Sequence, residues 1–431
     1  MNVQSEGAGK TRAGKLHALG VMCGLAAGAW LGAAEAPTKL VSLGFSPFLI
    51  SLGMVAGVFV ARWTVPMALK GSSYVFMDLR EKPHLILWAI LAGALWAVAN
   101  TLTIFAIRDV GLSIAFPLWN MNSLVGLFWG WLLFNELRAA GRRQWVKVLG
   151  GGLAIMAGAC VLGYATSQEA SGLSRHTLSG IAAALGAGLL WGTMYIPYRK
   201  AYISGMNPLS FVTIFTVGEL GTMALLALSF QGGAAPFVSE LSRIRPALFW
   251  LFLGGFCWVL GDLFQQYAAK YIGISRGIPL SNTNQLWGLA WGALVFGELA
   301  GKGSVHQALV IGGSAIMIVG AIAISRAEAP ASEQMSWKAA MRRECERYNL
   351  DFGRVEAACA GEDPLAGKAP ARSWWEALVF AGALGIFAWL AFGAEAQPLS
   401  MSIFWTCLLV ICTLGFLAIC AFTLWKRTRF S

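Results

Sequence analysis

The sequence has little charge and lacks the short motifs of common enzyme classes. Only 12% of its 431 residues are charged, and it has four histidines. We find no phosphate-binding G-x-x-x-x-G-K-[ST] loop, no H-E-x-x-H zinc motif and no hydrolase nucleophile elbow. These absences indicate that the chain is not an enzyme and cannot itself use ATP. We expect no cofactor.

Cysteine pairs that could hold a metal are also missing. The eight cysteines include no C-x-x-C pair, and six lie in apolar stretches: Cys23, Cys160, Cys257, Cys407, Cys412 and Cys420. Cys345 and Cys359 fall in a polar segment that we place in the cytosol, where thiols stay reduced. The sequence therefore predicts neither a disulfide framework nor a metal site.

The chain is rich in long apolar runs. Hydrophobic residues make up 57% of it, and its mean hydropathy is +0.63. Runs near the roughly 20 residues that span hydrocarbon recur at 16–36, 45–68, 85–107, 112–135, 145–165, 178–198, 208–230, 246–268, 274–297, 305–325, 376–395 and 401–425. Backbone polar groups must be paired inside lipid, so we expect helices. The predicted fold is an all-α polytopic membrane protein with 12 spans.

The net charge of +11 predicts orientation rather than nucleic-acid binding. We place the N-terminus inside because Lys10, Arg12 and Lys15 precede the first span. Inside segments then hold 24 of the 32 Lys and Arg residues, and outside segments hold six. This asymmetry follows the positive-inside rule. We expect both termini to be cytoplasmic, with the lipid bilayer as a partner and no nucleic acid.

One 27-residue segment occurs twice. Residues 111–137 and 273–299 align without a gap at an offset of 162, and 15 of the aligned residues are identical. The paired positions include Pro117/Pro279, Asn120/Asn282, Asn122/Asn284 and Glu136/Glu298, with Trp96/Trp258 and Asn100/Asp262 upstream. Shared composition of two membrane helices does not explain this agreement, so we infer a duplicated unit.

Each copy contains five spans, and this odd number predicts that the second copy is inverted in the membrane. We expect residues 1–169 to form the first five-helix repeat and residues 170–326 the second. Residues 376–431 would add a transmembrane hairpin of two helices.

Residues 327–375 form a polar stretch between the tenth and eleventh spans. Trp337, Met341, Cys345 and Tyr348 recur there at helical spacing. This pattern predicts a cytosolic amphipathic linker, which would lie on the anionic inner leaflet or stand as a solvated helix.

Two polar pairs beside prolines are the candidate substrate-binding residues. Pro117 and Pro279 each precede an Asn-x-Asn by three residues, and proline can break a helix and leave carbonyls facing a cavity. Asn side chains donate and accept hydrogen bonds, which suits the hydroxyls of a sugar or the amides of a nucleobase-like solute. The alternative is that they join neighbouring helices. The candidates are Asn120, Asn122, Asn282, Asn284 and Gln285.

Aromatic residues near these pairs could stack on a sugar ring. Trp119 and Trp287 flank the Asn pairs, and Trp191 and Tyr195 lie on the sixth span. A belt of tryptophans at the membrane interface is the alternative.

Charged residues inside the spans form a second class of candidates, because charge is costly in lipid. Asp262, Glu219 and Glu35 could bind a coupling proton. The alternative is a fixed ion pair with Arg276 or Arg62.

The repeat and the segment from Gly111 to Glu136 resemble the drug/metabolite transporter superfamily. Within it, the chain is most similar to the glucose/ribose porter group, which includes bacterial glucose-uptake proteins and the L-rhamnose/proton symporter. The resemblance covers residues 16–326 and implies a bacterial inner-membrane protein whose fourth and ninth spans line the substrate cavity. A homodimer is a candidate assembly.

These observations together predict a secondary active transporter that works by alternating access. A monosaccharide moved with protons is the favoured substrate. An exporter or permease for an amino acid, a ureide, a nucleobase-like solute or an organic cation is the alternative. A membrane-anchored interaction or sensory protein is a third reading, which predicts a cavity with no path to either side.

Overall fold

The computed structural model describes residues 2–34, 45–138, 140–166, 177–297, 303–365, 372–395 and 401–431. Regular structure in these ranges is entirely helical, as predicted. Ten continuous helical stretches in the described ranges are long and apolar enough to cross a membrane. They are α1 (Asn2–Ala34), α2 (Pro47–Lys70), α4 (His84–Val110), α7 to α8 (Arg142–Thr166), α9 (Thr177–Ile203), α10 (Pro208–Phe230), α11 (Ala234–Ile272), α14 (Ser304–Ser325), α17 (Trp375–Phe392) and α18 (Ile403–Thr428).

The remaining two predicted spans are broken helices. The first consists of α5 (Leu112–Trp119) and α6 (Asn122–Phe134). The second consists of α12 (Ile274–Ser281), α13 (Asn284–Ala290) and the π-helical turn η3 (Trp291–Val295). Each break begins three residues after a proline and contains the first Asn of a pair, so a helix end is placed deep in the bundle.

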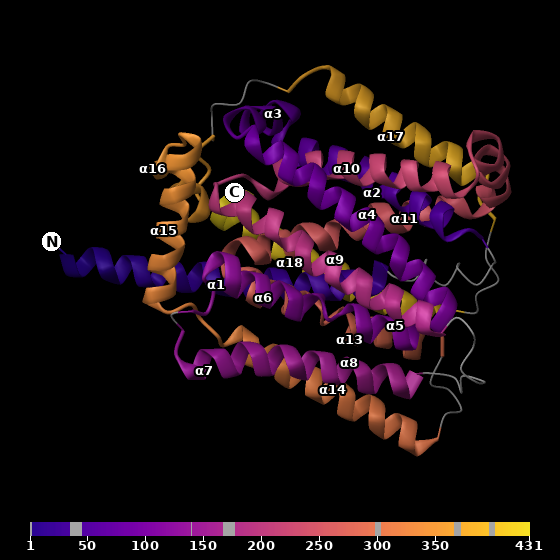
Figure 1. Cartoon of the computed structure of the whole chain (residues 1–431), viewed down its shortest axis with the longest axis horizontal. Coiled ribbons are helices and arrows are strands. Elements are labelled where there is room, and N and C mark those ends of the chain that lie inside the picture. The colour runs from indigo at the N-terminus through magenta and orange to yellow at the C-terminus, as the bar shows by residue number, and fades with distance from the viewer. Residues whose placement is uncertain are drawn as a thin grey trace.

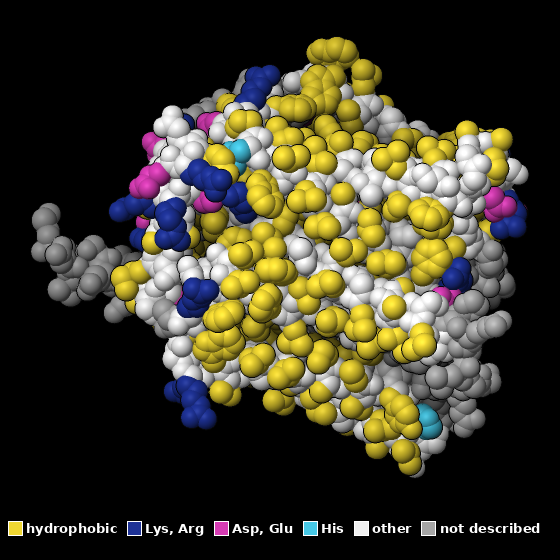
Figure 2. Space-filling model, viewed as in Figure 1, with side chains coloured by type: hydrophobic (Ala, Val, Ile, Leu, Met, Phe, Trp, Pro, Cys, Tyr) yellow, Lys and Arg dark blue, Asp and Glu magenta, His cyan; other side chains and the backbone are white. Residues whose placement is uncertain are grey.

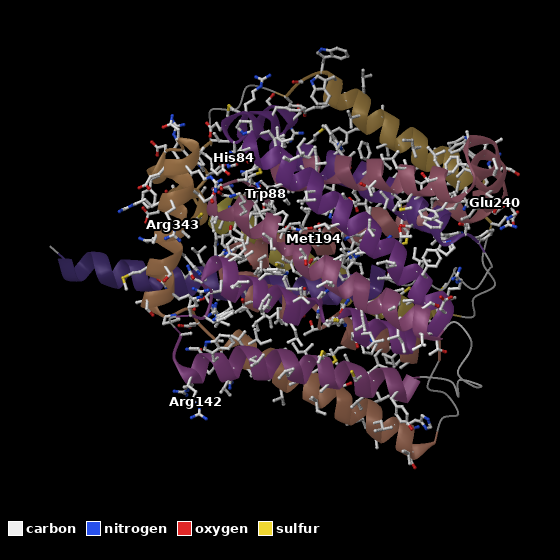
Figure 3. All side chains as sticks on the ribbon, viewed as in Figure 1. His84, Trp88, Arg142, Met194, Glu240 and Arg343 are labelled. Carbon is white, nitrogen blue, oxygen red and sulfur yellow. The ribbon has the colours of Figure 1, made fainter. Side chains whose placement is uncertain are left out.

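The helices run roughly side by side, with both chain ends and three short helices gathered at one end of the bundle (Figure 1). The short helices are α3 (Ser72–Glu81), α15 (Ala331–Tyr348) and α16 (Phe352–Cys359). We call this end the α15 end. Arg142 and Arg343 lie near it, and Glu240 lies at the opposite end (Figure 3). Apolar side chains cover most of the visible flank between the ends, as expected for a surface in contact with lipid (Figure 2).

Close approaches between helix backbones follow the predicted repeat. The backbone of α2 at Gly57 lies against that of α11 at Phe252, and α10 at Gly218 lies against α4 at Ile90. Gly57 and Gly218 are 161 residues apart, and Ile90 and Phe252 are 162 apart, so the repeat offset relates the two contacts. A side chain on either glycine would overlap the facing carbonyl group. Only glycine permits backbones to pack this closely.

A second set of helices shows the same exchange of partners. Gly151 of α8 faces the carbonyl of Gly320 on α14, and Gly158 faces that of Gly313. Gly151 and Gly313 are 162 residues apart, and so are Gly158 and Gly320. The helix α1 packs on α11, α12 and α13, as α9 packs on α4, α5 and α6. Such exchange is what an inverted duplication predicts, and the 5+5 repeat remains our interpretation of it.

The segment after α14 folds across the α15 end of the bundle. Met341 and Cys345 are buried, whereas Lys338, Arg342 and Arg343 are exposed, so α15 has the predicted amphipathic face. That face is covered by protein: Arg199 of α9 stacks on Trp337, and His84 of α4 stacks on Tyr348. It is therefore not available to the lipid surface.

The last two helices pack on different parts of the bundle. The helix α17 lies along α2 and α11, whereas α18 lies along α1 and η3. They are anchored mainly to the bundle rather than to each other. The appended hairpin in residues 376–431 remains a prediction.

Candidate functional site

A central cavity lies where the two broken helices meet. Its empty space, part of which is open to solvent, amounts to about 850 Å³. The lining residues are Leu31, Met54, Trp96, Asn100, Thr103, Ile107, Trp119, Asn120, Asn122, Trp191, Met194, Tyr195, Trp258, Gln265, Asn282 and Asn284. No side chain of this set carries a charge. Met194 marks the middle of the bundle in Figure 3.

The lining extends away from the α15 end. Leu31 and Ile107 belong to the last turns of α1 and α4, which finish at the opposite end of the bundle. Towards the α15 end, the side chains of Tyr198, Tyr202 and Phe215 are wholly buried and close the space between the helices. Buried aromatic side chains thus separate the cavity from the α15 end, as expected for one state of an alternating-access cycle.

Seven of the nine predicted substrate-binding residues line this cavity. They are Asn120, Asn122, Asn282, Asn284, Trp119, Trp191 and Tyr195. Gln285 is buried but is not part of the lining. Trp287 packs against Gly32 of α1 instead, because α13 has turned it out of the cavity.

The Asn side chains both join the broken helices and face the cavity. The Nδ2 atom of Asn282 donates to Oδ1 of Asn122 at 2.8 Å and to Oγ of Ser123 at 2.5 Å. This links α6 to the break before α13, as the structural alternative predicted. The Nδ2 atom of Asn120 has no hydrogen-bond partner. Buried donors are normally paired, so this atom is a candidate contact for a solute.

Two tryptophans form a part of the site that the sequence reasoning did not select. The rings of Trp96 on α4 and Trp258 on α11 lie 5.2 Å apart, and both line the cavity. Trp119 and Trp191 form a second pair at 6.1 Å. The repeat alignment had matched Trp96 with Trp258, which was the available signal. Asn100 and Gln265 also line the cavity and were not selected.

The intramembrane carboxylates are paired with one arginine. Arg62 of α2 donates to Oε2 of Glu219 on α10 at 2.8 Å and to Oδ2 of Asp262 on α11 at 2.7 Å. All three side chains are buried. Gln266 also donates to Oδ1 of Asp262 at 3.0 Å, and Tyr202 donates to Gln266. The ion-pair alternative thus describes the arrangement in this state, with Arg62 as the partner.

The other predicted charged residues lie elsewhere. Arg276 of α12 makes two hydrogen bonds to Glu333 of α15, at 2.8 and 2.9 Å, and both side chains are buried. Arg276 therefore binds the segment at the α15 end and does not reach Asp262 or Glu219. Glu35 lies outside the described residues.

Glu136 occupies the start of α12. Its carboxylate accepts from the backbone N–H groups of Ile274 at 3.3 Å and Ser275 at 2.9 Å, and it lies 2.9 Å from Arg199. A carboxylate at a helix N-terminus is stabilised by the unpaired N–H groups there. Glu136 thus ties the end of α6 to α12 and α9. Its repeat partner Glu298 lies outside the described residues.

Residues Gly273 to Gly277 read G-x-S-x-G, the pattern of a hydrolase nucleophile turn. In the structure, Ser275 is the second residue of α12, which follows α11 after Gly273, with no strand before it. The structural context of a nucleophile elbow is therefore missing at this serine. Among the described residues, no group of His, Cys, Asp and Glu is arranged to hold a metal ion.

Comparison with known proteins finds a transporter family that part of the chain resembles. Residues 178–320 match the model of the EamA-like transporter family. That segment lies within the predicted second repeat. A "Putative sugar uptake protein" of Streptococcus pyogenes serotype M1 is 25% identical over 284 residues, which cover 65% of this chain and 90% of the relative.

Two further matches have weaker coverage or similarity. A "Putative sugar uptake protein" of Lactobacillus johnsonii is 36% identical over 116 residues, 25% of this chain and 38% of the relative. A solved structure titled "Crystal structure of protein" covers 70% of this chain and 97% of its own, with 18% identity and a TM-score of 0.49. The chain is an integral membrane protein, and its residues 178–320 are similar to the EamA-like transporter family.

Proposed function

We propose that the protein is a secondary transporter that moves an uncharged polar solute, a monosaccharide, by alternating access. The observation that supports this best is the cavity lining. It combines neutral amides with four tryptophans and contains no charged side chain.

The chemistry of the lining favours a solute with hydroxyl groups. Asn120 Nδ2 and Trp191 Nε1 are donors without hydrogen-bond partners, and hydroxyl oxygens would accept from them. The indole faces of Trp96 and Trp258 offer apolar surface for the C–H face of a sugar ring. Binding a polar solute to unpaired donors restores hydrogen bonds that the empty site lacks.

The positions of Glu219 and Asp262 bear on whether the substrate could be a cation. An organic cation would call for an acidic group facing the cavity without a cationic partner. Glu219 and Asp262 both bind Arg62 and do not belong to the lining. The alternative of a permease for organic cations thus has less support than a sugar transporter, and the sugar-uptake names of the relatives point the same way.

The arrangement of helices suggests how access would alternate. The cavity lies between two sets of helices that exchange their packing partners under the repeat. On its α15 side, contacts join Glu136 to Arg199 and Arg62 to Glu219 and Asp262. Rocking one half against the other would separate these contacts and open the α15 end. We place that end in the cytosol, with both termini.

Uptake of labelled D-glucose, D-ribose and L-rhamnose into proteoliposomes tests the proposal. We expect saturable uptake of at least one sugar by the wild type. We expect Asn120→Leu to lose it, because the side chain loses its donor without breaking a hydrogen bond inside the protein. Gln307→Leu, an exposed amide on α14, is the matched control and should transport normally.

Normal sugar flux in a folded Asn120→Leu variant would refute the site assignment. Absence of flux for every sugar in a folded wild type would refute the sugar substrate. A wider screen with amino acids, ureides and organic cations would then follow.

A further inference from the structure

Three charged side chains from three helices meet below the cavity, on the side of the α15 end. Arg62 comes from α2, in the predicted first repeat, and Glu219 and Asp262 come from α10 and α11, in the second. The guanidinium binds one oxygen of each carboxylate. The exposed fractions of the three side chains are 0, 0 and 1%. We call these residues the Arg62 cluster.

The cluster is one positive charge short if both carboxylates are ionised. The other titratable groups facing it are the phenols of Tyr195, Tyr198 and Tyr202 on α9. A tyrosine phenol ordinarily carries no charge at neutral pH. Among the described residues, none supplies a second cation beside Glu219. An uncompensated buried charge is costly in a membrane interior, so a proton on one carboxyl group would neutralise the cluster.

The hydrogen bonds distinguish the two carboxyl groups. Both oxygens of Asp262 are occupied, one by Arg62 and one by the amide of Gln266, and both partners donate. Two donated hydrogen bonds stabilise an ionised carboxylate. Glu219 uses only Oε2, and its Oε1 has no partner although it is buried. The hydroxyl of Thr216, one helical turn earlier, lies near Glu219 and forms no hydrogen bond.

We propose that Glu219 is the binding site of a coupling proton, carried on Oε1. A proton there makes this oxygen a donor, for which the Thr216 hydroxyl is the acceptor, and leaves Oε2 to accept from Arg62. The cluster then consists of an Arg62–Asp262 ion pair beside a neutral acid. This inference rests on the proposed transport function and identifies a proton gradient as the energy source of transport.

The position of the cluster links the proton to the solute and to the conformation. The guanidinium carbon of Arg62 lies 5.6 Å from the ring centroid of Trp258, which lines the cavity. The cluster also joins the two predicted halves on the closed side. Separating the halves at the α15 end would draw Arg62 away from Glu219 and admit water. The acid would then release its proton to that water and become an anion.

The test uses Glu219→Gln in proteoliposomes with the labelled sugar that the wild type transports. A gradient of about one pH unit, acid outside, sustains up to about tenfold accumulation if one proton moves with each solute. We expect the wild type to accumulate sugar. Gln mimics the protonated acid, so the variant should reach only equal concentrations inside and outside, yet still exchange labelled for unlabelled sugar at a rate close to wild type.

Thr213→Val is a matched control for a nearby change on α10. The Thr213 hydroxyl donates to the backbone carbonyl of Arg62 at 3.0 Å and does not touch the carboxylates. This variant should keep gradient-driven accumulation. Undiminished accumulation by Glu219→Gln would overturn the inference. Exchange without any gradient-driven accumulation in the wild type would also overturn it, while leaving the transport function intact.

A second measurement needs no substrate. The infrared spectrum of the purified wild type should contain the band of a protonated carboxyl group at neutral pH, and Glu219→Gln should lack that band. Its absence from the wild type would refute the proton site even if no sugar is transported.

Discussion

The close packing of α10 on α4 gives a sharp prediction about Gly218. An alanine Cβ at this position would lie 2.8 Å from the carbonyl carbon and from the Cα atom of Ile90, and closer still to the carbonyl oxygen. These are backbone atoms in the middle of a helix, so no side-chain rotation relieves the overlap. Gly218→Ala must therefore push the two helices apart.

The size of the effect follows from the distances. Non-bonded carbon atoms are optimally about 3.5–4.0 Å apart, so the helices must separate by about 0.7 Å or more. Overpacking of this kind costs typically about 1–3 kcal/mol. Alanine is favoured over glycine within a helix by about 0.5–1 kcal/mol, which offsets a part of this cost. We expect a net loss of about 1–2 kcal/mol.

Gly221, three residues later on the same helix, is the matched control. Nothing lies within 4 Å of the Cβ that an alanine would add there. Gly221→Ala should therefore be neutral or slightly stabilising. The measurement is thermal unfolding of the purified protein in detergent, followed by tryptophan fluorescence. A Gly218→Ala protein as stable as Gly221→Ala would refute the close helix contact and the repeat symmetry inferred from it.

Three further predictions concern other parts of the molecule. Arg276→Ala leaves the buried Glu333 without its partner and should cost about 3–5 kcal/mol of stability, whereas Arg343→Ala, at an exposed position, should change the thermal unfolding temperature little. Trp258→Ala should raise the KM for transport about tenfold, if stacking contributes about 1.4 kcal/mol. Trp374→Ala, at a side chain that is 78% exposed, should leave the KM unchanged, and an unchanged KM in Trp258→Ala would remove Trp258 from the site. Glu136→Gln should slow transport by weakening the bonds to Arg199 and α12, and flux assays showing a wild-type rate would exclude a gating role for Glu136.

Much of the architecture could be predicted from local sequence. Apolar runs located the ten continuous spans, because hydrocarbon thickness sets their length. The prolines and Asn pairs located both helix breaks, since proline removes a backbone hydrogen bond and Asn can serve the groups that a break exposes. The gapless alignment of residues 111–137 with 273–299 identified the helices that meet at the cavity. Seven of the selected residues are in its lining for this reason.

The sequence was less informative where a side chain's role depends on its direction. Trp287 follows the second Asn pair, yet it faces α1, because α13 restarts after the break with a new rotation. Trp96 and Trp258 were aligned but not selected, since nothing in their own helices shows that α4 and α11 turn these faces towards each other. The direction in which a side chain points depends on how the helices pack, and a hydropathy pattern does not show this.

By itself, the sequence determined that this is a helical membrane protein built around a repeated segment with a neutral polar centre. Only the tertiary structure decided the partners of its buried charges. Arg62 binds carboxylates 157 and 200 residues away, and Arg276 binds the segment at the α15 end. Each charge had several possible counter-ions of the right sign, and the choice depends on which helix ends reach the same depth in the folded bundle.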